Sequence, residues 1–160
     1  MQCNHCLLGM AVSENGGSKI IHFFDQFAVM IITKQLLDNI SAQAKKSPRL
    51  RMNYNLHDSL ESKVQRLFNA LEPGTIIPVQ RHCNTAETLV LVRGRLKVDI
   101  YDDSRNVIES SVLSVDEENY GVHIPIGVWH TVESLEEGTI VFEVKEGPYA
   151  PLTDEDIMRF

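Results

Sequence analysis

The sequence predicts a mainly β domain of the sandwich or barrel class, preceded by a short helical segment. Seven short segments rich in β-branched residues follow Gly74, turn-forming residues separate them, and no helical periodicity lies between them. Such closely spaced strands are typical of an antiparallel sandwich or barrel. The chain has 160 residues, of which 43% are hydrophobic, and this length suffices for one self-supporting core.

The predicted strands are short, and most end at turn-forming residues. Arg93-Gly94, the polar run 102–106 and Glu136-Glu137-Gly138 separate neighbouring strands. The seven segments are 75–79, 88–93, 95–101, 107–113, 122–125, 128–133 and 139–145.

The region ahead of these strands predicts two helices with a strand between them. Thr33 is a good N-cap for a first helix, which Ser47-Pro48 ends because a residue before proline avoids the α region. A second helix is predicted over 58–71, because Asp58 and Glu61 resemble a capping box and an apolar stripe follows. Between them, apolar and polar residues alternate over 49–57, which indicates an extended strand. The second stripe consists of Leu60, Val64, Leu67, Phe68 and Leu71.

We divide the chain into four parts. Residues 1–29 are an N-terminal extension, 30–71 a helical segment packed on the β domain, 72–150 the β domain, and 151–160 a C-terminal tail. The apolar run 20–32 contains His22 and Asp25 and is shorter than the roughly 20 residues that a membrane helix needs. It also lacks the order of a signal peptide, so we expect no membrane partner.

Charge and cysteine content narrow the functional classes. The net charge is −7, with +4 on residues 30–71 and −8 on residues 72–147, and this acidic balance argues against nucleic acid as a partner. The basic segment either docks on the acidic domain or offers its arginines to an anionic ligand. Three cysteines form no disulfide framework, which fits a cytoplasmic protein. We interpret the lone Cys3-x-x-Cys6 pair as incidental rather than as a metal or redox site.

The chemically richest stretch is 80–87. Gln80 and His82 are two residues apart on a predicted strand, so they face the same side, and Glu87 follows a short loop. A second imidazole, His130, follows the turn at 125–127. Two histidines and one carboxylate form the kind of ligand set that holds Zn, Fe, Mn or Ni, although a single histidine on a strand usually has a structural role.

The order and spacing of these residues resemble the two motifs of the cupin superfamily. Gly74-x5-Gln80-x-His82-x4-Glu87-x6-Gly94 resembles the first motif, and Pro125-x-Gly127-x2-His130 resembles the core of the second. The resemblance implies a cupin, jelly-roll-like β-barrel preceded by the two N-terminal helices, with a divalent metal held by His82, Glu87 and His130.

Two departures from the cupin pattern concern the ligands and the turns. Gln80 stands where the first motif has its first histidine, so it would ligate weakly, through water, or not at all. Asn119 and Ser134 stand where the second motif has its leading glycine and its final asparagine. These two positions serve turn geometry and leave the ligands unchanged.

Longer runs resemble the WbuC family of cupin-fold metalloproteins over residues 30–151. The resemblance implies a bacterial protein linked with O-antigen (lipopolysaccharide) or other surface-polysaccharide synthesis. The runs that carry it are 47–57 (SPRLRMNYNLH), 64–74 (VQRLFNALEPG), 125–131 (PIGVWHT) and 143–149 (EVKEGPY).

Candidate ligand-binding residues lie on the strand over 49–57 and on the last strand. Arginine suits phosphate and asparagine suits hydroxyl groups, whereas the alternative is that the arginines pair with acidic residues and Tyr54 packs in the core. On the last strand, Lys145 and Glu143 would form an acid–base pair inside the domain, although we favour a solvated outer face. The candidates are Arg49, Arg51, Asn53, Tyr54, Asn55 and Lys145.

Three functions fit these residues. The first is a metal-dependent sugar or nucleotide-sugar isomerase or epimerase, with a small anionic or sugar-like ligand. The second is a non-enzymatic module that binds or senses such a ligand, and the third is an iron-dependent dioxygenase. Apolar residues on both faces of the strand 88–92 also permit a homodimer.

Overall fold

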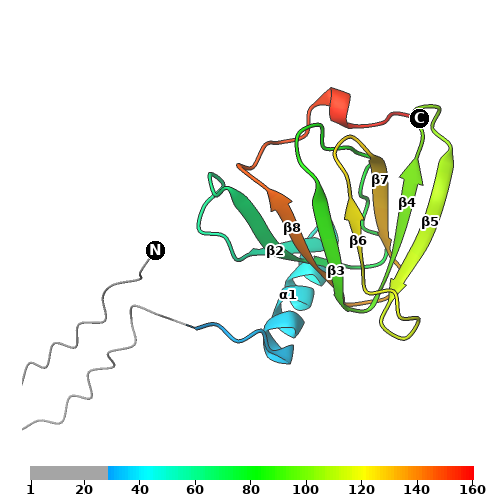
Figure 1. Ribbon diagram of the computed structural model, residues 1–160. Coiled ribbons are helices and arrows are strands. Elements are labelled where there is room, and N and C mark those ends of the chain that lie inside the picture. Colours follow the sequence, from blue (N-terminus) through cyan, green and yellow to red (C-terminus); the bar gives the residue numbers. More distant parts are fainter. Residues whose placement is uncertain (1–28) are drawn as a thin grey trace, which may run out of the picture. The chain divides into compact units, whose positions relative to one another are not determined.

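Two antiparallel β-sheets face each other across an apolar interior in the computed structural model, which describes residues 29–160 (Figure 1). The first sheet has the strand order β1-β2-β8-β3-β6, and the second has the order β5-β4-β7. One α-helix, α1 (Lys34–Lys46), precedes the strands, and a 3-10 turn (Asp154–Asp156) follows them. The strands are β1 (Arg51–Asn55), β2 (Val64–Leu71), β3 (Glu87–Arg93), β4 (Arg95–Tyr101), β5 (Val107–Ser114), β6 (Gly121–Ile124), β7 (Trp129–Ser134) and β8 (Thr139–Glu146).

The structure confirms most predicted elements and corrects three. Six of the seven predicted strands coincide with β3 to β8 within two residues at each end, and the strand predicted over 49–57 is β1. The segment 75–79 forms no strand, because Pro78 lacks the N–H that a ladder needs. The two sheets are also not closed into the predicted barrel.

The second predicted helix is wrong, because residues 64–71 form the strand β2. This strand pairs with β1 on one side and β8 on the other, so it lies inside the sheet. Both of its faces are covered, which buries Phe68 and Ala70 on one face and Leu67 and Leu71 on the other. A strand buried on both faces loses the simple alternation of apolar and polar residues, so its apolar run can imitate a helical stripe.

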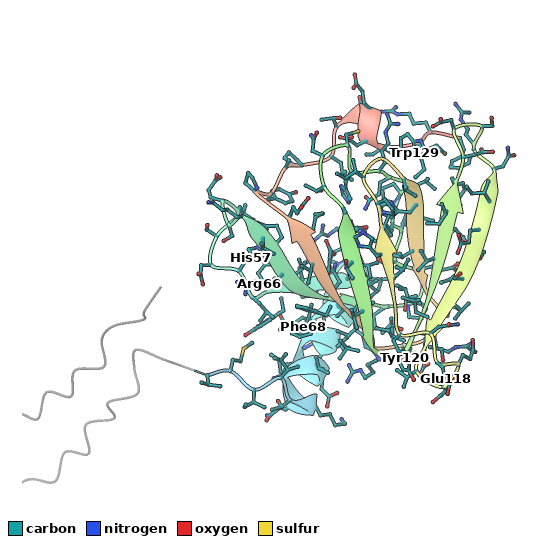
Figure 2. All side chains as sticks on the ribbon, in the orientation of Figure 1. His57, Arg66, Phe68, Glu118, Tyr120 and Trp129 are labelled. Atoms are coloured by element: carbon teal, nitrogen blue, oxygen red, sulfur yellow. The ribbon has the colours of Figure 1, made fainter. Side chains whose placement is uncertain are left out.

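Helix α1 begins as predicted and packs on the outer face of the five-stranded sheet. The Thr33 side chain accepts a hydrogen bond from Leu36 N, 3.2 Å away, which caps the helix. Phe68 lies between helix and sheet, where its ring packs against Phe142 with centroids 5.4 Å apart (Figure 2). We call this buried set the outer cluster: Leu37, Ile40, Ala44, Phe68, Ala70 and Ile140.

The space between the two sheets is filled by a second apolar cluster. Leu71, Leu89 and Val141 come from the five-stranded sheet, and Leu96 and Val98 come from β4. These side chains pack the interior at one end of the strands, whereas the inward-facing side chains toward the other end of β8 are polar. The candidate site lies in that polar part of the interior.

Cys3, Cys6 and almost all of the proposed extension 1–29 lie outside the described residues. Within residues 29–160, no helix is long and apolar enough to cross a bilayer.

Candidate metal centre

Three side chains from distant parts of the sequence meet in the polar interior. His82 precedes β3, Glu87 is the first residue of β3, and His130 lies in β7. His130 Nε2 is 2.7 Å from Glu87 Oε1, and His82 Nε2 is 3.2 Å from Glu87 Oε2. One ligand atom from each residue fits within 4.8 Å of the other two. The structure therefore brings together the three residues that the sequence predicts as ligands.

The backbone around these residues fixes their positions. Gln80 and His130 exchange two backbone hydrogen bonds of 2.8 Å, which place segment 80–82 beside β7. The turn before β7 contains Gly127 at φ +79°, a conformation that favours glycine, and its N–H donates to His82 O. The turn that aims His130 thus also holds His82.

The C-terminal tail forms backbone hydrogen bonds with segment 79–81 on the edge opposite to β7. Arg81 N donates to Asp156 O over 3.0 Å, and Met158 N donates to Val79 O over 2.9 Å. The Arg81 guanidinium also lies 4.3 Å from the ring centre of Trp129, which Figure 2 labels close to the tail. The segment that carries His82 therefore has backbone partners on both edges.

The orientation of the histidines fits a metal ion. His130 Nδ1 lies 2.9 Å from Val128 O, so it carries the proton and leaves Nε2 as the lone-pair nitrogen. Both Nε2 atoms are buried, and among the described residues neither has a partner in hydrogen-bond geometry, despite their closeness to Glu87. Buried nitrogen atoms that converge without hydrogen bonding are arranged as metal ligands are.

The carboxylate of the cluster is held in its charged form. Burial raises the pKa of Glu87, but the close approach of the His130 and His82 imidazoles outweighs it and holds that pKa well below its ordinary value. Burial lowers the pKa of His130, while Glu87 raises it, and the net direction is upward. An ionised carboxylate beside imidazoles is the state that a divalent metal requires.

Lys145 and Glu143 point into this interior, which corrects our preference for a solvated outer face. Their side chains are 19% and 12% exposed, and Lys145 Nζ lies 3.5 Å from Glu143 Oε1 and 3.9 Å from Glu87 Oε2. Asn69 Nδ2 donates to Glu143 Oε2. Burial and the charge of Glu87 raise the pKa of Glu143 against the opposite effect of Lys145. The sequence pattern could not decide which face of β8 is inward.

A cavity of about 260 Å³ connects this cluster with the basic strand β1. Arg49, Arg51 and Asn53 line it from one side, and Gln80, Glu87 and His130 line it from the other. Gln80 therefore lies at the predicted site.

The two arginines that line this cavity are not paired with acidic residues. Within residues 29–160, neither Arg49 nor Arg51 has a carboxylate within 4.0 Å, and Arg51 instead donates to Ile76 O over 2.8 Å. Burial and the charge of Arg49 lower the pKa of Arg51. The basic segment nevertheless docks on the acidic domain elsewhere, through a Lys45–Glu137 pair at 2.7 Å.

The remaining candidate ligand-binding residues, Asn55 and Tyr54, lie on opposite faces of β1. Asn55 lines a second cavity next to the first, together with Lys145. Tyr54 packs against the outer cluster instead, because its side chain alternates to the opposite face from Asn53 and Asn55. Tyr54 thus follows the alternative stated for it, packing in the core.

Sequence reasoning missed three polar residues of this interior. Gln65 and Asn69 line its cavities from β2, and Tyr149 lines the second cavity from the segment after β8. The first two lie in the segment read as a helix. Reading Gln65, Leu67, Asn69 and Leu71 as one face of a strand would have placed both amides on the inner side.

Comparisons with solved structures identify the fold. KdgF from Halomonas sp. superposes with a TM-score of 0.51 at 14% identity, over 65% of this chain and 84% of that chain. Procruciferin, the 11S globulin of Brassica napus, gives 0.52 at 17% identity, over 64% of this chain and 26% of that chain. These neighbours are cupin-fold proteins, so the chain has the cupin fold.

Two curated relatives share part of the sequence. Mannose-1-phosphate guanylyltransferase of Escherichia coli K12 is 27% identical over 136 residues, which are 79% of this chain and 26% of that protein. The protein of the same name from Salmonella montevideo is 34% identical over 91 residues, 56% of this chain and 17% of that protein. The chain thus spans about a quarter or less of the length of these relatives.

A family model assigns the chain to a family. The model matches residues 32–113, which comprise α1, strands β1 to β4 and most of β5, and include His82 and Glu87. The chain belongs to the family described as "Domain of unknown function (DUF6016)".

Proposed function

We propose that this protein is a divalent-metal cupin that acts on a sugar or nucleotide-sugar, in the manner of an isomerase or epimerase. His82, Glu87 and His130 hold the metal in this proposal, and Gln80 supports it. The observation that carries it is the pair of buried Nε2 atoms that converge on Glu87 without hydrogen-bond geometry. Zinc, iron, manganese and nickel all suit this ligand set.

The biological setting of the proposal depends on similarity. The matched relatives are named mannose-1-phosphate guanylyltransferases, and the sequence resembles the WbuC family. Both point to sugar chemistry, and the second points to O-antigen or other surface-polysaccharide synthesis in bacteria. The unpaired Arg49 and Arg51 in the cavity wall are suited to the phosphate of a sugar phosphate or nucleotide-sugar.

The residues around the cluster are suited to proton transfer next to a polarised oxygen. A bound divalent metal would polarise a carbonyl or hydroxyl oxygen of the ligand. Glu143 is a carboxyl group whose raised pKa lets it both hold and accept a proton, and Asn69 fixes its orientation. The Lys145 ammonium lies between Glu143 and Glu87, where it compensates negative charge in the interior.

A non-enzymatic binding module is the second candidate, and one observation favours it. Lys145 Nζ lies between two carboxylates, 3.5 Å from Glu143 Oε1 and 3.9 Å from Glu87 Oε2, so Glu143 is already engaged in an ion pair. If Glu143 serves only to hold Lys145, the cavity binds a ligand without transforming it.

Metal analysis tests the central claim. Full-length protein prepared with excess zinc, iron, manganese or nickel should retain about one divalent ion per chain after gel filtration, measured by mass spectrometry. His130→Ala and Glu87→Gln should lose that ion. His123→Ala is the matched control, because His123 is an exposed imidazole bonded to Thr88 on the neighbouring strands. Metal-free wild-type protein, or full metal content in His130→Ala, would contradict the proposal.

Isotope exchange separates the two candidates. Metal-loaded protein is incubated in D₂O with a panel of sugar phosphates and nucleotide-sugars, and mass spectrometry follows deuterium incorporation at carbon. An isomerase or epimerase should label one of these substrates, and Glu143→Gln should reduce labelling by about 10²–10⁴-fold. Saturable binding without any labelling favours the binding module.

A further inference from the structure

A second cavity, of about 370 Å³, adjoins the metal-centre cavity. Asn53, Glu143 and Lys145 line both, so they form a shared wall. We call the two spaces the metal-side cavity and the amide-side cavity. The remaining wall of the amide-side cavity consists of Asn55, His57, Leu60, Gln65, Leu67 and Tyr149.

His57 contributes a buried donor to the amide-side cavity. Its Nδ1 lies 3.0 Å from Arg66 O and 3.1 Å from Arg66 N (Figure 2). Because Leu56 N already donates to Arg66 O over 2.8 Å, we assign Nδ1 as the acceptor of the Arg66 N–H. This assignment pairs every one of these backbone groups, and it places a ring proton on Nε2. His57 is only 8% exposed, and its Nε2 has no partner within residues 29–160. A buried N–H of this kind usually has an acceptor, and in the wall of a cavity a ligand can supply it.

The amide-side cavity is a firmly built part of the fold. The Gln65 carboxamide donates to Ser62 O over 3.0 Å and to Leu60 O over 3.3 Å, which ties the loop between β1 and β2 to β2. Tyr149 N donates to the same Leu60 O over 2.7 Å. These bonds use the Gln65 NH₂ group and leave its Oε1 as an acceptor beside the His57 donor.

The two cavities differ in charge. The metal-side cavity contains Arg49 and Arg51, which have no carboxylate partner in the described part of the chain, so it favours an anionic group. Among residues 29–160, the charged residues lining the amide-side cavity are Glu143 and Lys145, which pair with each other at 3.5 Å. Its other polar groups are carboxamides, an imidazole and a phenol, which are suited to hydrogen bonds with hydroxyl groups.

We infer that the amide-side cavity is a subsite for a neutral hexose unit, and that His57 is a specificity-determining donor to one of its hydroxyl groups. The anionic part of the same ligand occupies the metal-side cavity, and in this respect the inference rests on the proposed function. Small-molecule sites usually enclose about 300–1,000 Å³. The metal-side cavity, at about 260 Å³, lies below that range, and the amide-side cavity, at about 370 Å³, lies inside it, so a two-part ligand that uses both is well accommodated.

Calorimetric titration with mannose 1-phosphate, mannose and inorganic phosphate tests this subsite on metal-loaded, full-length protein. His57→Asn keeps an acceptor for Arg66 N–H but removes the Nε2 donor. It should weaken mannose 1-phosphate binding about tenfold, as expected for one lost hydrogen bond to a buried donor, and leave phosphate binding unchanged. Arg51→Met should weaken phosphate binding and leave mannose binding unchanged. His123→Asn, the matched control, should change neither.

Each outcome is decisive for the subsite. Absence of saturable binding of both mannose and mannose 1-phosphate to the wild type overturns it, as does unchanged affinity in His57→Asn. If His57→Asn does not fold, Asn55→Ala replaces it, because Asn55 is an exposed residue of the same wall and should lower mannose 1-phosphate affinity similarly. Metal content is measured on the same samples. A metal-free protein that binds mannose contradicts the proposed function alone, whereas a metal-loaded protein that binds neither sugar contradicts the subsite alone.

Discussion

The two faces of the five-stranded sheet come from the same strands but serve opposite purposes. On β8, Ile140 and Phe142 point outward into the apolar cluster under α1, while Glu143 and Lys145 point inward to the candidate metal centre. The outer face consists of hydrocarbon packed against a helix, and it stabilises the sheet. The inner face buries charges that oppose folding unless they are paired. Alternate side chains of β8 thus serve either the stability of the sheet or the candidate site.

The largest effect should come from breaking the outer face. Phe68→Ala removes a side chain that is 2% exposed between β2 and α1, and it should lower the free energy of unfolding by about 3–5 kcal/mol. Chemical denaturation measures this loss. Val64→Ala on the same strand is the control, because that side chain is 43% exposed and should change stability by less than about 0.5 kcal/mol. Equal losses in the two variants would show that the helix does not stabilise the sheet.

A smaller loss is expected where α1 is anchored by a charged side chain. Arg93 donates to Asp38, Ser41 and Gly138 O, and it joins β3 to α1 and the turn before β8. Arg93→Met should cost about 1.5–3 kcal/mol in denaturant unfolding. Arg95→Met is the matched control, since its pair with Glu117 is exposed and is worth about 0–1 kcal/mol. A cost at Arg95 as large as that at Arg93 would contradict this assignment.

Neutralising one carboxyl group on the inner face should increase stability. The pKa of Glu143 is raised by burial and by Glu87, so its ionised form is less favourable in the folded than in the unfolded chain. Its penalty is absent at acid pH and appears as the pH rises above the unfolded value near 4.5. Glu143→Gln should therefore raise the Tm of metal-free protein at pH 7, by less than Arg93→Met lowers it, and should have no effect near pH 4. Glu109→Gln, exposed on β5, should have no effect at either pH. A lower Tm for Glu143→Gln at pH 7 would show that the Lys145 pair outweighs burial.

The smallest effect should come from an exposed carboxylate beside the outer face. Hydrogen bonds from Lys34 and Arg93 lower the pKa of Asp38. A lowered pKa contributes stability above the ordinary value near 3.8, and this contribution is lost as the pH falls through the folded value. Asp38→Asn should therefore lower the Tm slightly at pH 7, and the difference should shrink toward pH 3. A difference that grows on acidification would reverse the assigned sign.

The parts of the fold that sequence predicts best are those with a single buried face or a local signal. Local signals correctly predicted several elements. They are the N-cap of α1 at Thr33, the alternation of apolar and polar residues in β1, and the glycine and polar turns between the later strands. The prediction for β2 was wrong because β1, β8 and α1 surround this strand and both of its faces are buried. Of these neighbours, only β1 is adjacent to β2 along the chain. The intrinsic secondary-structure propensity of a segment does not indicate that elements distant in sequence will bury it.

The candidate site shows the same division. Motif spacing predicted that His82, Glu87 and His130 belong together, and the structure places them together. Lys145 and Glu143 point inward because of the register in which β8 pairs with its neighbours. One face of β8 is apolar and the other is charged, and the sequence pattern does not predict which of the two faces inward. The positions of Gln65 and Asn69 in the cavity walls were not predicted, because the residues of β2 were assigned the periodicity of a helix instead of that of a strand.

The pairing of the C-terminal tail with segment 79–81 also bears on aggregation. This segment would otherwise present unpaired N–H and C=O groups beside the candidate ligands, and open sheet edges of this kind recruit strands from other molecules. Residues 156–158 occupy that edge through the bonds of Asp156 O and Met158 N. The tail thereby prevents the segment that carries His82 from pairing with a second molecule.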